Sequence, residues 1–71
     1  MVLFTDINNN AHESHNKFSL LIIDPDNIWI ESYHNKQCQA ENRWKEIYKT
    51  GVYYKCIIYD PNGNIVFSYY S

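Results

Sequence analysis

Two pairs of metal-binding side chains stand at short spacings in this sequence. His12 and His15 are separated by two residues, and His34 and Cys38 are separated by three. Such spacings occur within zinc sites, but zinc modules usually contain two cysteines in a tight knuckle, and the first pair here lies in a polar segment. We therefore expect solvated histidines and a cysteine at a helix start, with no cofactor. A small zinc-binding protein is kept as an alternative.

Nucleophilic catalysis would need a cysteine or serine beside a base. Cys56 lies in an apolar run, where burial keeps a thiol unreactive, and Cys38 follows His34 by one helical turn. The chain has two glycines, so it contains no glycine-rich loop for an oxyanion or a phosphate. The aspartates beside the prolines are typical of turns. The sequence thus predicts a protein that is not an enzyme and has no catalytic residues.

Length and composition narrow the class of protein. The chain has 71 residues, so one small domain is expected. Its net charge is -2 and its basic residues are not clustered, which disfavours nucleic acid as a partner. No apolar run approaches the roughly 20 residues that span a membrane, which argues against a membrane partner. No basic and apolar leader is visible either, so we expect a cytoplasmic protein with reduced thiols.

Hydrophobic patterning predicts two β-hairpins joined by a helix. Each hairpin has two apolar runs around a proline-containing turn, over residues 18–34 and 52–70. Between them, apolar side chains recur at helical spacing near residues 37–50, with Trp44 at the centre of the stripe. The predicted fold class is α+β: a ββαββ domain over residues 18–71, with a four-stranded antiparallel sheet and an amphipathic helix on one face.

The segment before this domain, residues 1–17, has a different character. Residues 2–7 are a short apolar stretch, and residues 8–17 are polar and aperiodic. Polar residues without periodicity between ordered segments are typical of loops. We therefore expect an N-terminal strand or a mobile arm, connected to the domain by a polar loop.

Strand alternation indicates what each face of the sheet carries. If both turns contain three residues, Asp24 lies opposite Ile28 and Asp60 lies opposite Asn64, and side chains alternate from there. The helix covers one face, so the other face would present large rings to a partner. The candidate partner-binding residues are Trp29, Tyr33, Tyr53, Tyr59, Phe67 and Tyr69. The alternative is that residues 2–7 fold back across this face and cover it.

The aromatic face is the main indication of function. Monomeric proteins seldom expose so large an apolar patch, and Tyr and Trp are enriched at interfaces. We expect an interaction protein that binds a surface of a larger protein through this face or through an edge strand, or that forms a homodimer. The abundance of Asn, Ile, Tyr and Lys is typical of an AT-rich genome and fits an inhibitor or adaptor from a phage or mobile element. Stacking of single-stranded nucleic acid on the rings is the alternative, although it lacks a cationic groove.

Overall fold

The computed structural model describes residues 1–51 and 54–70. Within these residues the chain forms one helix and six strands. Their bounds are β1 Leu3–Thr5, β2 Ala11–Glu13, β3 Phe18–Ile23, β4 Ile28–His34, α1 Gln37–Lys49, β5 Lys55–Tyr59 and β6 Ile65–Tyr69. The predicted ββαββ arrangement is confirmed, with the helix in the predicted place. No helix in the described part of the chain is long and apolar enough to cross a membrane.

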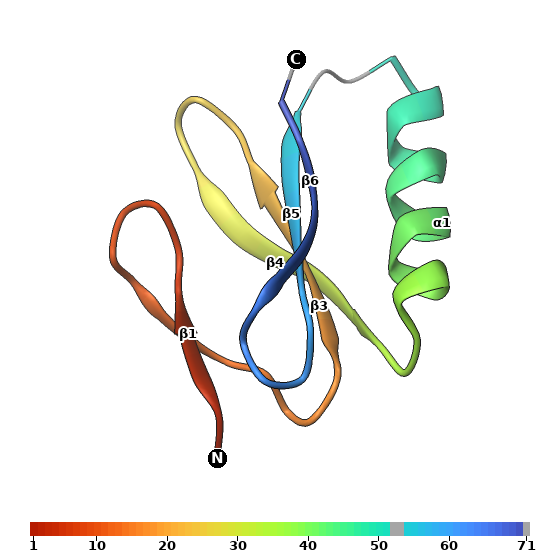
Figure 1. The fold of residues 1–71 in the computed structure, drawn as a ribbon. Coiled ribbons are helices and arrows are strands. Elements are labelled where there is room, and N and C mark those ends of the chain that lie inside the picture. Colours follow the sequence, from red (N-terminus) through yellow and green to blue (C-terminus); the bar gives the residue numbers. More distant parts are fainter. Residues whose placement is uncertain (52–53, 71) are drawn as a thin grey trace.

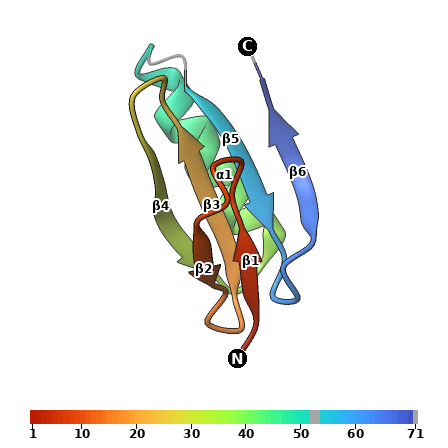
Figure 2. The same ribbon diagram turned by 90° about the vertical axis from the view of Figure 1, so that its left-hand side faces the viewer.

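The elements form three layers (Figure 1). The middle layer is a four-stranded antiparallel sheet in the order β4-β3-β5-β6, so β4 and β6 are its edges. Helix α1 packs on one face, which we call the helix face. Strands β1 and β2 pair as a separate antiparallel hairpin and lie on the other face, in front of β3 and β5 (Figure 2). We call this second face the hairpin face.

The helix face is closed by the narrow apolar stripe of α1. Trp44 and Ala40 are both buried. They pack against buried side chains of β3 and β5, namely Leu20, Ile22, Cys56 and Ile58. The helix begins after Lys36, whose backbone N–H donates to Oε1 of Gln39 at 3.3 Å and so gains a partner at the helix start. The prediction that Trp44 is a core residue is confirmed.

The hairpin face is covered by Phe4 of β1. The Phe4 ring is buried and stacks on Tyr59 of β5, with ring centroids 4.1 Å apart. The Tyr59 hydroxyl also donates to the carbonyl of Thr5 at 3.3 Å. The remaining buried side chains of this core come from β3 and β5 and are Leu21, Ile23 and Ile57. The structure therefore shows the alternative in which residues 2–7 fold back across the sheet.

The turn between β3 and β4 is one residue shorter than predicted. Backbone hydrogen bonds of 2.8 and 3.2 Å join Asp24 and Asn27 in both directions, so the loop holds two residues rather than three. The Asp24 carboxylate accepts the N–H of Asp26 at 3.0 Å, which stabilises this tight turn. As a result, Trp29 lies opposite Ile22 on the helix face. The predicted position of Trp29 on the outer face is wrong.

The turn between β5 and β6 is the predicted three-residue loop, in which the N–H of Asp60 donates to the carbonyl of Asn64 at 2.8 Å. A β-bulge follows directly, and an extra residue in a strand reverses the side chains beyond it. It places Phe67 opposite Ile58 and turns Tyr69 to the same helix face. The predicted positions of these two rings on the outer face are wrong.

A second bulge lies in β4, between the residues that pair with Leu20 and Leu21. Its extra residue compensates for the turn between β3 and β4, which is one residue shorter than predicted. Tyr33 therefore lies opposite Ser19, on the predicted face. Tyr59 is also on the predicted face, although Phe4 covers it. Tyr53 lies outside the described residues.

Residues 8–17 hold more regular structure than the predicted polar loop, because β2 forms within them. The turn before β2 has the geometry of the β5–β6 turn. The N–H of Asp6 donates to the carbonyl of Asn10 at 3.0 Å, and the Asp6 carboxylate accepts the N–H groups of Asn8 and Asn10. Asn9 adopts a φ of 64°, in the position where the β5–β6 turn has glycine.

Candidate interaction surface

Three of the six predicted partner-binding rings lie beneath α1 rather than on an open face. Trp29, Phe67 and Tyr69 are half-buried and pack against the helix-face core. The Trp29 ring makes an edge contact with Tyr54 at 5.5 Å, and the Tyr69 ring lies 5.6 Å from Trp44. These rings contribute mainly to the core, so each has only part of its surface left for a partner.

The other predicted rings do not form a continuous surface either. Tyr59 is 3% exposed beneath Phe4, and this burial raises the pKa of its hydroxyl. Tyr33 is 37% exposed and meets the ring of His15 edge-on at 5.0 Å. Tyr53 is outside the described residues. The described rings of the predicted set are thus divided between the two faces of the sheet.

Exposed apolar side chains lie at β6 and at the residue after it, and also in the N-terminal segment, where Met1, Val2, Leu3 and Ile7 are exposed. Ile65, Val66 and Tyr70 are 60%, 36% and 57% exposed. Among the described strands β6 pairs only with β5, so alternate residues direct N–H and C=O groups away from the sheet. The strand has no charged residue and no proline, which are the usual means of preventing edge pairing. This edge is therefore open to another strand.

The opposite edge, β4, is protected by charge and by its bulge. Glu31 stands at the bulge and accepts a hydrogen bond from Arg43 of α1 at 2.6 Å. The same guanidinium lies 3.5 Å from Glu46, and its contact with Glu31 raises the pKa of Arg43. A bulged edge that carries a charged residue disfavours the addition of a strand. Of the two edges of the four-stranded sheet, β6 is therefore the less protected against pairing.

Side chains of helix α1 reach β6 at two points on the helix face. Near the helix start, Nε2 of Gln37 donates to the carbonyl of Val66 at 3.5 Å, and in its last turn Tyr48 accepts a hydrogen bond from the Tyr69 hydroxyl at 3.3 Å. Between the C-terminal half of α1 and β6 lies a slot of about 210 Å³. The slot is lined by rings and by the side chains of two lysines: Trp44, Lys45, Tyr48, Lys49 and Tyr69.

Two histidines form side-chain hydrogen bonds on opposite faces of the sheet. In the hairpin layer, Nε2 of His12 lies 2.8 Å from a carboxylate oxygen of Asp6. On the helix side, Nε2 of His34 lies 2.7 Å from the hydroxyl of Ser32. An acid and a base are thus together in one place, and a hydroxyl and a base in another. The two pairs do not combine into one site.

The side chains of the zinc alternative are His12, His15, His34 and Cys38. Within residues 1–51 and 54–70, no group of three His, Cys, Asp or Glu side chains is placed to hold a metal ion. Both cysteines are free. Cys38 is exposed, whereas Cys56 is buried, and burial raises the pKa of the Cys56 thiol to about 12.

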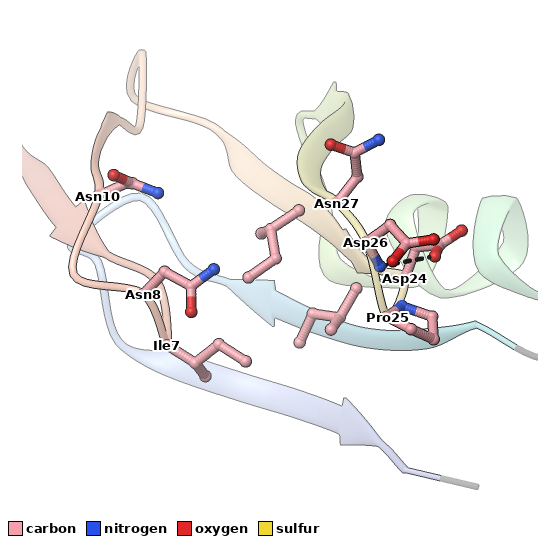
Figure 3. A pocket seen from close by; sticks show the side chains of 9 residues that line it. Ile7, Asn8, Asn10, Asp24, Pro25, Asp26 and Asn27 are labelled. Carbon is pink, nitrogen blue, oxygen red and sulfur yellow. Dashed lines mark hydrogen bonds between the residues drawn. The ribbon is translucent and has the colours of Figure 1, made fainter.

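A second depression, of about 420 Å³, lies between the β1–β2 turn and the β3–β4 turn (Figure 3). Ile7 and Asn8 line it from one turn, and Pro25 and Asp26 line it from the other. Its polar side chains are exposed or half-buried, and the Asp24 carboxylate already accepts the Asp26 N–H. With no buried polar group directed into it, this depression indicates no particular ligand.

Comparisons with known proteins do not assign any of these surfaces. No protein family, curated protein or solved structure matches the chain.

Proposed function

We propose that this chain is a small non-enzymatic interaction protein, an inhibitor or adaptor, that binds a surface of a larger protein through the edge of β6. The supporting observation is an uncharged edge strand with exposed apolar side chains on a packed sheet. An extended segment of the larger protein would pair with the free backbone groups of β6. Its side chains would cover Ile65, Val66 and Tyr70.

Strand addition replaces the aromatic face as the mode of contact. On the hairpin face Tyr59 is covered by Phe4, and on the helix face Trp29 and Tyr69 pack beneath α1. Stacking of single-stranded nucleic acid would need several rings on one open face. Because the rings are divided between two covered faces, the geometry favours a protein partner.

The same proposal extends to location and origin. Free thiols at both cysteines are typical of a reducing compartment, which supports a cytoplasmic location. The Asn-, Ile-, Tyr- and Lys-rich composition supports an origin in an AT-rich genome. A small inhibitor or adaptor of a phage or mobile element, acting on a protein of its host, fits both observations.

The test places a charge on the β6 edge. Wild-type protein and the variants Ile65→Lys and Val66→Lys are immobilised and used to capture proteins from a host lysate. A captured protein is then purified and its affinity measured. Both positions are exposed, so the variants should stay folded, and we expect a loss of affinity of about tenfold or more because a lysine at an edge opposes pairing. Leu3→Lys, on the outer side of β1, is the matched control.

Amide hydrogen exchange supplies the second readout. In the complex, the exposed amides of β6 should become protected, while those of β4 should not change. Full affinity in both edge variants, together with loss of binding in the Leu3 variant, would transfer the contact to the hairpin. The native mass of the protein alone tests the homodimer, because two β6 edges can pair antiparallel around a two-fold axis.

A further inference from the structure

Three of the five lysines of the chain lie around the C-terminal end of β6. Lys45 and Lys49 line the slot beside Tyr69. On the other side of the strand, Nζ of Lys55 lies 6.0 Å from the centre of the Tyr70 ring. None of the three lysines forms an ion pair with a described carboxylate, unlike Arg43. Three lysines thus lie near this end of β6, while the intervening Glu46 is paired with Arg43, in a protein whose net charge is -2.

The slot lies where a side chain of an added strand would point. Side chains of a strand alternate between the two faces, so every second side chain of a strand beside β6 points to the helix face. There it meets the groove between Tyr69 and the rings of Trp44 and Tyr48. The slot, at about 210 Å³, is smaller than the roughly 300–1,000 Å³ of small-molecule pockets, so it suits one apolar side chain rather than a whole ligand.

Charge along α1 also has a direction. Glu41 stands one turn before Lys45, toward the start of β6, and Lys49 stands at the end of the helix. An acidic segment would therefore be favoured beside the C-terminal half of β6. A basic segment would be repelled there, and charge of this kind contributes to selectivity and to association rate.

Building on the proposed strand addition, we propose that β6 selects an extended acidic segment of another protein, with one apolar side chain seated in the slot between α1 and β6. The acidic side chains on either side of this anchor face Lys45 and Lys49.

A peptide fits this surface better than a nucleic acid strand does. A phosphate backbone would use the lysines, but it would leave the free backbone groups of β6 without partners of matching spacing. The stacking surface is also small, because Trp44 is buried and the rings of Tyr48 and Tyr69 pack on each other and on Trp44.

The experiment uses labelled, capped peptides and the full chain at low salt, with fluorescence anisotropy as the readout. The probe is Thr-Glu-Val-Leu-Val-Glu-Thr. One control replaces both Glu residues by Lys, and another replaces Leu by Ser. We expect the probe to bind about tenfold more tightly than either control, and the double variant Lys45→Glu, Lys49→Glu to prefer the basic peptide. Circular dichroism confirms that the variant is folded, since both lysines are exposed.

Backbone methylation separates this inference from the proposed function. Two methylated forms of the probe are made, one N-methylated at the odd-numbered residues and the other at the even-numbered residues, and we call these the two phases. Alternate N–H groups of an added strand point toward β6, so one phase should lose binding and the other should retain it. If the phases differ but the acidic and basic peptides bind equally, strand addition stands and the acidic preference is wrong.

Two further results decide the inference. If the acidic preference holds but both methylated phases bind equally, the lysines select acidic chains without strand addition and the proposed function fails. No binding of any peptide up to about 1 mM overturns the inference, because that limit corresponds to only about 4 kcal/mol of binding free energy. Binding of an oligothymidylate by the same three lysines, without peptide binding, would assign the surface to single-stranded nucleic acid instead.

Discussion

Removal of the Phe4 ring should show how strongly the N-terminal hairpin is held on the sheet. Phe4 is buried and stacks on Tyr59, so Phe4→Ala removes the largest side chain that β1 places on the hairpin face. Phe to Ala changes in cores cost about 3–5 kcal/mol. At about 0.05–0.15 kcal/mol per residue, the whole chain of 71 residues has about 4–11 kcal/mol of stability. We therefore expect this one substitution to remove a large part of the free energy of unfolding.

The assay is urea unfolding followed by tryptophan fluorescence, with Leu3→Ala as the matched control. For the smallest domains the free energy changes by about 1 kcal/mol per M urea, so a loss of about 3 kcal/mol lowers the midpoint by about 3 M. Leu3 is 58% exposed on the same strand, so its variant should stay within about 0.5 kcal/mol of wild type.

Equal midpoints for the two variants would refute this view of the hairpin. Both tryptophans pack on the helix face, so fluorescence reports on the four-stranded sheet and α1. Amide exchange in β1 and β2 reports on the hairpin itself. Rapid exchange there in Phe4→Ala, with an unchanged urea midpoint, would show that the hairpin contributes nothing to the stability of the rest of the protein.

Three other predictions concern buried groups and turns. Cys56 should resist a thiol reagent at pH 8 in the folded protein while Cys38 reacts, because burial raises the Cys56 pKa to about 12; reaction of both thiols without denaturant would contradict this. Burial raises the pKa of Asp6, but hydrogen bonds from an imidazole and two backbone N–H groups outweigh it and leave the pKa below 3.8. A lowered pKa in the folded state gives stability that is present above about pH 4 and is lost as the pH falls through the folded pKa. Asp6→Asn should therefore be less stable than wild type at pH 7 and less sensitive to acid below pH 4. Equal acid sensitivity of the two proteins in urea titrations would count against this prediction. In thermal unfolding, Gly63→Ala should destabilise the protein more than Gly51→Ala. Both glycines have positive φ, which costs alanine about 1–2 kcal/mol. Only at Gly63 would the new Cβ also contact β1, at 3.3 Å from the Cβ of Phe4.

The elements of this fold follow from short-range patterns, whereas the faces of the sheet do not. Helix α1 and strands β3 to β6 lie where periodicity and turn residues predict them. The same loop length is predicted for both proline turns, but only the second has a glycine, Gly63 at φ 86°, at the third loop position. Asn9 takes the same position without glycine in the β1–β2 turn, so the lack of glycine near Pro25 does not by itself indicate the shorter turn. The two bulges have no comparable sequence signal, because an extra residue is accommodated by packing between strands.

The N-terminal hairpin and the candidate edge were predictable in part. Residues 6–10 read Asp-Ile-Asn-Asn-Asn and residues 60–64 read Asp-Pro-Asn-Gly-Asn, so the aspartate and two asparagines recur at the same spacing in both turns. That likeness indicates a hairpin where polarity alone suggested a loop. The lack of charge in residues 65–69 is equally visible in the sequence. That these residues form an edge depends on the strand order, which only the tertiary structure supplies.

The contacts of the N-terminal hairpin with β5 and the β5–β6 turn join segments that are synthesised at different times. The Ser14 hydroxyl donates to the Pro61 carbonyl across 47 positions, and Tyr59 donates to Thr5 across 54. The hairpin is synthesised before strand β5 and the turn on which it docks. Strand β3 likewise has one neighbour, β5, that begins only after the helix has been completed. During translation Phe4 of β1 therefore lacks its stacking partner Tyr59 until β5 has left the exit tunnel, so the nascent chain is exposed to aggregation until then.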